Sequence, residues 1–228
     1  MSTHIDRLSS SLLESWRDEE EDEERRAEEN SKRSCELLSV GKDLLPDSEL
    51  DTFELAPSAL YSLCVKASET SLAMLLCWLD YDERHYSHPK KIPNPAPFFS
   101  RAGGKIVEAG ADDKLMLLYA EGIRFPLAFA VIKDDTFTID IIGVFTKCKR
   151  RGVGKYFVSE LIKRAKMKGC KEYRIKSLIS SILFWRGCGF SPIPARDLGF
   201  EDKKELEYHR PMTMQLTQHR HNTKCENW

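Results

Sequence analysis

The sequence predicts an α+β fold, in which helices flank a mixed, mostly antiparallel sheet that contains one parallel strand–helix–strand unit. Three observations support this prediction. Strand-like apolar segments follow one another between residues 114 and 145. From Gly152 the apolar residues recur at helical spacing instead of alternating. A further strand-like segment follows Gly169, and the strands on either side of a crossover helix pair in parallel.

The chain of 228 residues has room for one sizeable domain with an attached tail. We expect an acidic, flexible N-terminal arm over residues 1–45, a folded domain over residues 46–217 and a short tail over residues 218–228. Residues 14–29 hold ten acidic side chains and three basic ones, so this segment cannot bury its own surface. We expect a solvated helix or a mobile segment there and place no core residue in it.

The first half of the folded region is expected to begin with a short strand over residues 52–55. Pro57 then favours the first turn of a helix, with apolar residues at 60, 63, 64 and 67 on one face. Leucines at helical spacing over residues 71–79 predict a second helix in the core. Polar and proline residues over 80–104 predict a long irregular loop.

The second half is expected to form the sheet. Strands are predicted over residues 114–120, 126–132 and 136–145, with a hairpin turn at 133–135. An amphipathic helix runs from Gly152 and ends at Gly169. A strand over 173–178, a helix over 180–186 and a closing strand from Met212 follow.

The most informative segment is a basic loop between the strand that ends at residue 145 and the following helix. It consists of Lys149, Arg150, Arg151, Gly152, Val153 and Gly154. The glycines let the backbone approach a ligand, and the first N–H groups of the helix have no partner within it. Helix dipole and basic side chains add positive charge, so the loop is an anion site or, on the plainer interpretation, a solvated basic turn. It has neither the spacing of a Walker loop nor the glycine triplet of a dinucleotide fold.

This segment resembles the GNAT superfamily of acyl-CoA-dependent N-acyltransferases, whose signature is Gln/Arg-x-x-Gly-x-Gly/Ala between a strand and the next helix. Lys149 stands where Gln or Arg is usual, which keeps the charge. Residues 183–190 (LFWRGCGF) are similar to the aromatic-x-x-x-Gly-Phe ending of the helix that packs beneath the cofactor in this family. The resemblance covers residues 53–216 and implies a GNAT-like fold.

The resemblance also implies that acetyl-CoA is the acyl donor. In the family, backbone N–H groups of the loop bind the pyrophosphate, and the preceding strand, where it separates from its parallel neighbour, receives the pantetheine arm and the acyl group. Carried over residue by residue, the expected cofactor contacts are Ile142, Gly143, Val144, Lys149, Arg150, Arg151, Gly152, Val153, Gly154 and Lys155.

Catalytic candidates are few. Trp185 stands where many members of the family carry a tyrosine, and an indole N–H cannot act as the acid for a thiolate. This is similar to the histone acetyltransferase branch, in which a carboxylate on the strand before the loop removes the proton. The usual place aligns with Thr138, and Asp140 lies two residues on, on the same strand face. We expect Asp140 to be the base, directly or through a water; the alternative is a solvated strand carboxylate that pairs with a basic neighbour. Backbone N–H at Gly143 or Val144 is expected to polarise the thioester carbonyl.

The leading functional hypothesis is an N-acetyltransferase that moves the acetyl group of acetyl-CoA onto a primary amine, with protein lysine slightly favoured because of Trp185 and the acidic arm. The alternatives are a small-molecule amine acetyltransferase and a GNAT-like acyl-CoA-binding module that has lost turnover. Residues 146–176 hold twelve basic and two acidic side chains, but no interleaved aromatic residues favour nucleic acid.

Metal and membrane binding are not expected. The histidines and the cysteine at residues 85, 88, 219, 221 and 225 fit no standard metal-site spacing. Seven irregularly spaced cysteines, no apolar signal core and no long apolar run predict an intracellular protein, in the cytoplasm or the nucleus, with reduced thiols and no membrane segment.

Overall fold

The computed structural model describes residues 2–86, 98–133, 138–199 and 209–216. The chain divides into two compact units, which we call the helical unit and the sheet unit. The helical unit comprises Met1–Glu54, Lys66–Leu115 and Arg124–Pro126, and the sheet unit comprises Leu55–Val65, Met116–Ile123 and Leu127–Trp228.

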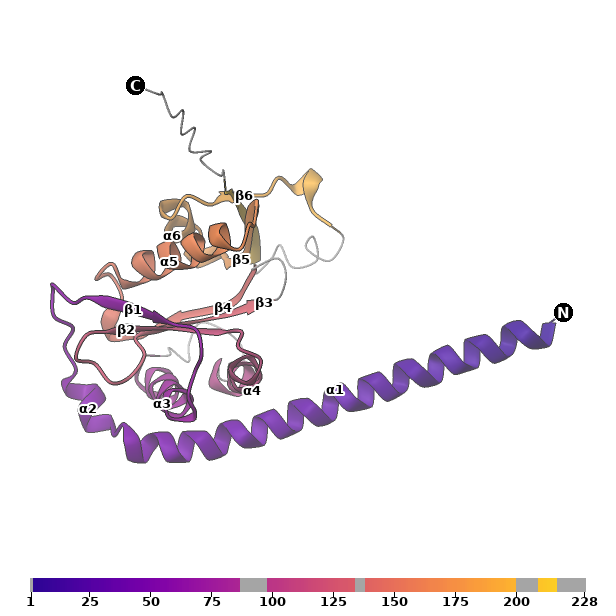
Figure 1. Ribbon diagram of the computed structural model, residues 1–228, viewed down its shortest axis with the longest axis horizontal. Coiled ribbons are helices and arrows are strands. Elements are labelled where there is room, and N and C mark those ends of the chain that lie inside the picture. Colours follow the sequence, from indigo (N-terminus) through magenta and orange to yellow (C-terminus); the bar gives the residue numbers. More distant parts are fainter. Residues whose placement is uncertain (1, 87–97, 134–137, 200–208, 217–228) are drawn as a thin grey trace, which may run out of the picture. The chain divides into compact units, whose positions relative to one another are not determined.

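The described residues of the helical unit form four helices. They are α1 (Ser2–Leu44), α2 (Asp47–Thr52), α3 (Glu69–Tyr86) and α4 (Phe98–Ala111). The C-terminal turns of α1 pack against α3 and α4 (Figure 1). Helix α1 approaches α3 so closely that a Cβ on Gly41 would lie 2.2 Å from the carbonyl oxygen of Ala73. Leu45 and Leu50, on either side of the turn into α2, are fully buried.

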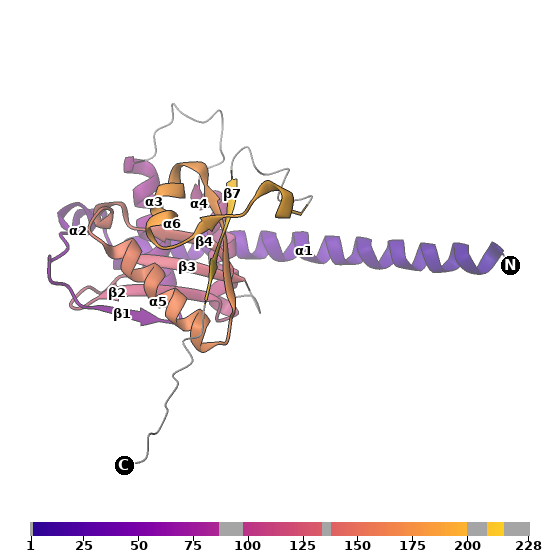
Figure 2. The same ribbon diagram turned by 90° about the horizontal axis from the view of Figure 1, so that it is seen from above.

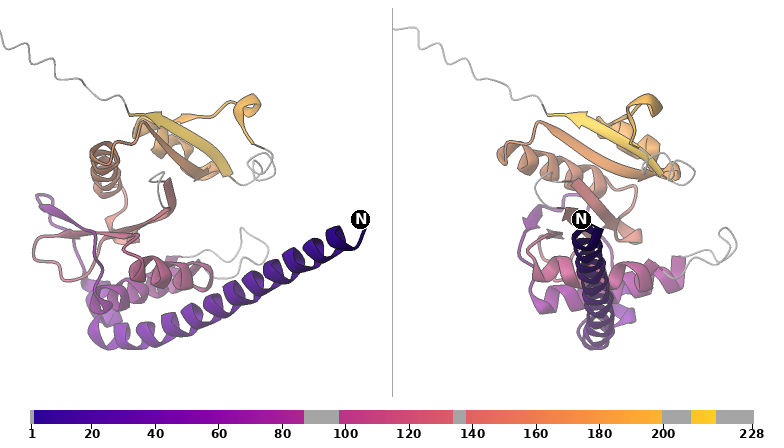
Figure 3. Two further views of the ribbon diagram at one scale, coloured as in Figure 1. Left: turned by 45° about the vertical axis from the view of Figure 1, so that its right-hand side comes forward. Right: turned by 90° about the vertical axis from the view of Figure 1, so that its right-hand side faces the viewer.

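Helix α1 therefore differs in its last turns from the arm expected over residues 1–45. Ser34 is buried and Gly41 lies against α3, so these turns belong to the core of the helical unit. Residues 17–29 are exposed at every position. Figures 1 and 3 show this part of α1 extending beyond α3 and α4. A role for residues 1–29 as an arm stays a prediction.

Three expectations for residues 52–104 are wrong. The strand expected over 52–55 does not form, because α2 continues to Thr52 and residues 53–56 lie in neither a helix nor a strand. Residues 61–64 form strand β1 instead of a helix, because Tyr61 pairs with Ala120 and Cys64 with Leu117, and this pairing outweighs an apolar spacing that also fits a helix. The expected loop over 80–104 is helical at both ends, since α3 continues to Tyr86 and α4 starts at Phe98. Residues 87–97 between them lie outside the described residues.

In the part of the sheet unit that the structure describes, seven strands follow the order β1-β2-β3-β4-β5-β7-β6. Their bounds are β1 Tyr61–Cys64, β2 Leu115–Ala120, β3 Ala128–Lys133, β4 Thr138–Val144, β5 Glu172–Leu178, β6 Ser191–Pro192 and β7 His209–Gln215. Strands β3 and β4 pair antiparallel, as do β5 and β7, which lie side by side in Figure 3. Strands β4 and β5 are parallel, with helix α5 (Val153–Met167) between them in the chain. The predicted α+β fold, a mostly antiparallel mixed sheet with one parallel strand–helix–strand unit, is confirmed.

Strand β4 contains an irregularity that decides which side chains share a face. Its residue Ile141 pairs with Val131 of β3, but Ile139 pairs with the next residue, Ile132, so the register passes over Asp140. Such an extra residue is a β-bulge, and it shifts the alternation of faces by one. Because cross-strand partners share a face, Ile142 lies on the same face as Ile139 in spite of their odd spacing.

Helices α5 and α6 (Ile182–Gly187) lie on this same face of the sheet unit. The ring of Phe190, just after α6, lies 5.8 Å from that of Tyr173, which shares its face of β5 with Ile175 and through it with Ile139. At the start of α5, a Cβ on Gly154 would lie 3.5 Å from Val144. Figure 2 shows α5 running along the strands. One face of the parallel unit is thus covered by the ends of two helices.

Candidate functional site

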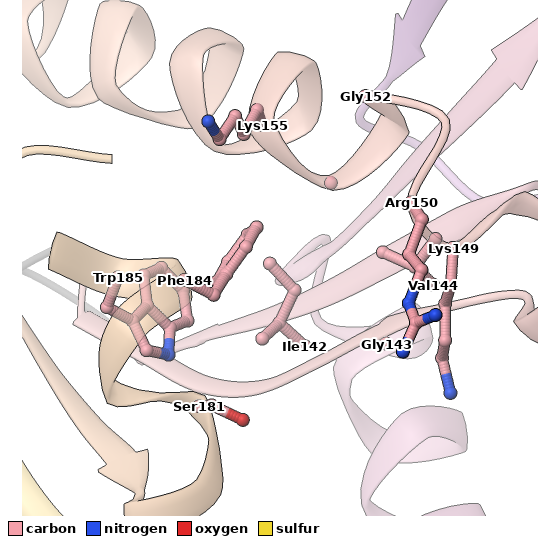
Figure 4. A pocket seen from close by; sticks show the side chains of 11 residues that line it. Ile142, Gly143, Val144, Lys149, Arg150, Gly152, Lys155, Ser181, Phe184 and Trp185 are labelled. Atoms are coloured by element: carbon pink, nitrogen blue, oxygen red, sulfur yellow. The ribbon is translucent and has the colours of Figure 1, made fainter. Parts of the chain in front are cut away.

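A cavity of about 610 Å³ lies between the start of α5, helix α6 and strand β4 (Figure 4). This volume falls within the range of small-molecule sites. The lining residues are Ile142, Gly143, Val144, Lys149, Arg150, Gly152, Gly154, Lys155, Ser181, Phe184 and Trp185.

Eight of the ten residues expected to contact the cofactor line this one cavity. They are Ile142, Gly143, Val144, Lys149, Arg150, Gly152, Gly154 and Lys155. Arg151 and Val153 do not line it: the Arg151 guanidinium donates a hydrogen bond of 2.9 Å to the carbonyl oxygen of Leu55, and Val153 is fully buried. The reason is that successive residues at a helix start point in different directions, so a continuous run of sequence cannot face one cavity.

The loop backbone is shaped to present N–H groups. Arg150 has a φ of 63° and Gly152 a φ of 85°, and this left-handed backbone on either side of Arg151 turns N–H groups toward one side of the loop. Gly152 is the N-cap of α5 and supplies no side-chain hydrogen bond, so the first-turn N–H groups of the helix lack a capping acceptor. A Cβ on Gly152 would meet no described atom within 4 Å, which leaves the approach open.

The charge of the lining is positive. Lys149, Arg150 and Lys155 are cationic, and none of the described lining residues is acidic. The Lys155 ammonium reaches toward α6, since its Nζ would lie 3.8 Å from a Cβ on Gly187. Burial raises the pKa of the neighbouring Cys188 thiol, although Lys155 opposes this, so Cys188 remains a neutral thiol at pH 7. Cations and open helix N–H groups together suit this end of the cavity to an anion.

Aromatic side chains form the other wall of the cavity. Phe184 and Trp185 pack edge to face at 5.1 Å, and Trp185 rests on Phe190. A Cβ on Gly154 would lie 3.3 Å from the Phe184 ring, so this glycine keeps the passage between α5 and the ring open. The sequence motifs do not single out Phe184, although it lies within the LFWRGCGF segment, and no motif provides a signal for Ser181.

The side of β4 that faces β5 is largely unpaired. The register between these strands contains one pair, Ile139 with Ile175, among the described residues. The cavity residues Ile142, Gly143 and Val144 lie beyond it. Backbone N–H and C=O groups need partners, so this stretch of β4 can bind a ligand that carries amide groups of its own.

Asp140 does not line the cavity. Its Oδ1 lies 3.2 Å from the Lys133 ammonium, and its side chain is 24% exposed. Lys133 pairs with Thr138, so this contact places Asp140 on the face of Thr138, as expected, while Ile142 and Val144 lie on the opposite face because of the bulge. The carboxylate therefore stands on the other side of the sheet from the cavity wall.

The remaining expectations concern metals and membranes. The described part of the chain holds no cluster of three or more His, Cys, Asp or Glu that could bind a metal, and residues 88, 219, 221 and 225 lie outside it. Among its helices, none is both long and apolar enough to cross a membrane.

Neither a protein-family model nor a curated protein sequence matches the chain. Solved structures do. A GNAT-family acetyltransferase from Staphylococcus aureus Mu50 superposes with a TM-score of 0.50 at 13% identity, over 69% of this chain and 100% of that one. The ribosomal-protein-S18-alanine N-acetyltransferase of Escherichia coli has a TM-score of 0.46 at 14% identity, over 72% and 98%.

The N-acetylglutamate synthase of Neisseria gonorrhoeae, complexed with coenzyme A and N-acetyl-glutamate, has a TM-score of 0.48 at 12% identity. The match covers 71% of this chain but 36% of the synthase, so the chain spans about a third of that protein. At such low identities the likeness is one of fold. The chain has the fold of the GNAT-family acetyltransferases, as the basic loop and the ending of α6 predict.

Proposed function

We propose that the protein transfers the acetyl group of acetyl-CoA to a primary amine. The observation that carries this proposal is the cavity itself, which joins a cationic helix start, suited to a pyrophosphate, to an unpaired length of β4. Coenzyme A has two parts that match them: a pyrophosphate for the helix start, and an arm with two amide groups for the strand. A solvated basic turn would need neither the cavity nor the open strand.

In this proposal the pyrophosphate accepts hydrogen bonds from the first-turn N–H groups of α5, with Lys149, Arg150 and Lys155 adding charge. Arg151 and Val153 contribute backbone N–H groups only, because their side chains are committed elsewhere. The pantetheine arm lies along β4 between Val144 and the Phe184 ring. The thioester then reaches Gly143, where a backbone N–H of Gly143 or Val144 holds the oxyanion.

We propose Asp140 as the base that takes a proton from the ammonium form of the acceptor. Strands β4 and β5 are separated beyond Ile139, so an amine can approach from the Asp140 face while the thioester lies on the cavity face. The Lys133 contact orients the carboxylate. We favour a protein lysine as the acceptor over a small amine, because Trp185 lacks a hydroxyl, like its counterparts in the histone acetyltransferase branch.

Calorimetric titration with acetyl-CoA tests donor binding. Gly152→Asp places a carboxylate at the proposed pyrophosphate site and should weaken binding at least 100-fold, on the scale of a lost charge-assisted contact plus repulsion. Gly169→Asp is the matched control: its φ is 80°, it too has no described atom within 4 Å of a Cβ, and it lies beyond the other end of α5. No heat and no thermal shift for the wild-type protein would exclude the proposal.

Labelled acetyl-CoA offered with pooled lysine peptides, amino acids and polyamines tests turnover and acceptor class together. Asp140→Asn should lower kcat about 100-fold, the usual contribution of a general base, while acetyl-CoA binding stays unchanged. Equal turnover would show that Asp140 is not the base. Binding without transfer to any pool would favour the binding-module alternative.

A further inference from the structure

The described lining of the cavity carries one hydroxyl group. Among its described lining residues, Ser181 alone carries an O–H, while Lys149, Arg150 and Lys155 belong to the cationic set and Trp185 offers an indole N–H that does not ionise near neutral pH. Figure 4 shows Gly152 and Lys155 on one side of Ile142 and Ser181 on the other. The hydroxyl thus lies across the cavity from the start of α5, where the proposed function puts the pyrophosphate.

The Ser181 hydroxyl is not used by the fold. Ser181 precedes α6 as its N-cap, where a serine oxygen normally accepts a backbone N–H, yet it makes no such capping bond. No described residue hydrogen-bonds to its Oγ. Ser177, by contrast, donates to the carbonyl oxygen of Leu178 at 2.8 Å, and Ser159 to that of Tyr156 at 2.7 Å.

The start of α6 fixes where this hydroxyl lies. Residues three and four apart share a helix face, so Ser181 stands with Phe184 and Trp185 on the cavity side. Ile179 and Leu183 lie on the outer side and are 52% and 80% exposed. Ser181 is half-buried, and the low polarity that Phe184 and Trp185 give to the cavity wall strengthens a hydrogen bond made there.

We propose that Ser181 protonates the sulfur of coenzyme A as the acyl group leaves, in place of the tyrosine that Trp185 replaces. This inference rests on the proposed function. The amine nitrogen forms a bond to the carbonyl carbon, and the tetrahedral intermediate then breaks its C–S bond, with the electron pair going to sulfur. The Ser181 proton passes to that sulfur, and the serine oxygen takes up, through a water, the proton that the nitrogen loses. The products are the amide and the free thiol, and the serine is restored.

Steady-state kinetics test this role. Ser181→Ala should lower kcat about 100-fold, as expected for loss of a group that acts in the transition state, with the KM for acetyl-CoA within twofold of wild type. Ser181→Thr, which keeps the hydroxyl, should recover most of the rate. Ser180→Ala is the matched control, since Ser180 is exposed and is not among the lining residues.

Binding to coenzyme A and to desulfo-coenzyme A provides a readout that does not depend on turnover. At a pH where the bound thiol ionises, Ser181→Ala should weaken coenzyme A about tenfold and leave desulfo-coenzyme A unchanged, since a hydrogen bond to a charged group is lost only for the first ligand. An equal loss for both ligands, or an unchanged kcat, would overturn the role of Ser181 while the proposed function stood. A wild-type protein that binds neither ligand would overturn both.

Discussion

The two edges of strand β5 differ sharply. On one edge, all seven residues from Glu172 to Leu178 are in register with β7. On the other edge, among the described residues, the register with β4 holds one pair, Ile139 with Ile175. The paired edge satisfies its backbone within the fold and so contributes stability. The open edge leaves backbone groups of β4 beside the cavity. Because unpaired backbone groups are costly to bury, this stretch of β4 is suited to a ligand that supplies partners.

The largest effect should come from filling the space beside the open edge, between the start of α5 and strand β4. Gly154→Val adds methyl groups where a Cβ alone would already lie 3.3 Å from Phe184 and 3.5 Å from Val144, so the passage for the pantetheine arm closes. We expect acetyl-CoA affinity to fall about 100-fold or more, as for a steric block in a pocket, measured by calorimetry. Ser159→Val, an exposed site on the same helix, should bind normally. Normal binding by Gly154→Val would mean that the donor lies elsewhere.

A smaller effect should follow from reversing one charge in the lining of the cavity beside the open edge. Lys155→Glu replaces a lining cation with an anion and should weaken acetyl-CoA about tenfold at low salt, with the difference shrinking as salt screens it. Lys166→Glu reverses an exposed charge outside the lining near the C-terminal end of α5 and serves as the control. If both variants lose affinity equally, the effect reflects overall charge and not the cavity.

The smallest effect belongs to the paired edge. Glu172 accepts hydrogen bonds from Thr213, on β7, at 2.6 Å and from Arg174 at 2.9 Å, and these hold the pKa of its carboxyl below its ordinary value of 4.5. A lowered folded pKa stabilises the protein above the ordinary value, and this stabilisation is lost as pH falls through the lower one. Glu172→Gln should therefore cost about 1 kcal/mol of unfolding free energy at neutral pH and almost nothing in acid, in urea titrations at both pH values.

The same variant also tests whether the paired edge of β5 contributes to acetyl-CoA binding. Glu172→Gln should leave acetyl-CoA affinity unchanged at neutral pH, because Glu172 is not among the described lining residues. Glu28→Gln, on the exposed part of α1, should change neither stability nor affinity. A loss of affinity in Glu172→Gln would show that the paired edge also supports the site.

The parallel unit and most of the cavity could be predicted because their signals are local. The Gly152 and Gly154 spacing, the helical stripe that follows and the aromatic ending of α6 each lie within a short stretch of sequence. Elements that depend on distant partners were missed. Strand β1 forms because β2 lies beside it, and the last turns of α1 are buried because α3 accepts Gly41 at contact distance.

The face of Asp140 shows the same limit on a smaller scale. The sequence predicts that Asp140 shares a face of the strand with Thr138. The bulge, which puts Ile142 on the opposite face, arises from the register with β3 and has no sequence signature. Ser181 could not be predicted for a different reason. A serine before a helix normally caps it, and only the structure shows that Ser181 makes no capping hydrogen bond.

The extra residue in β4 also acts as a partition. Without it, strict alternation would put the Asp140 carboxylate in the same wall as Ile142 and Val144, next to the place where the proposed function puts the polyanionic donor. With it, one strand presents an apolar surface to one side and an acid to the other. In the proposed reaction, this one residue keeps the anionic donor and the cationic acceptor on opposite sides of the sheet, and deleting Asp140 would remove both the acid and the separation.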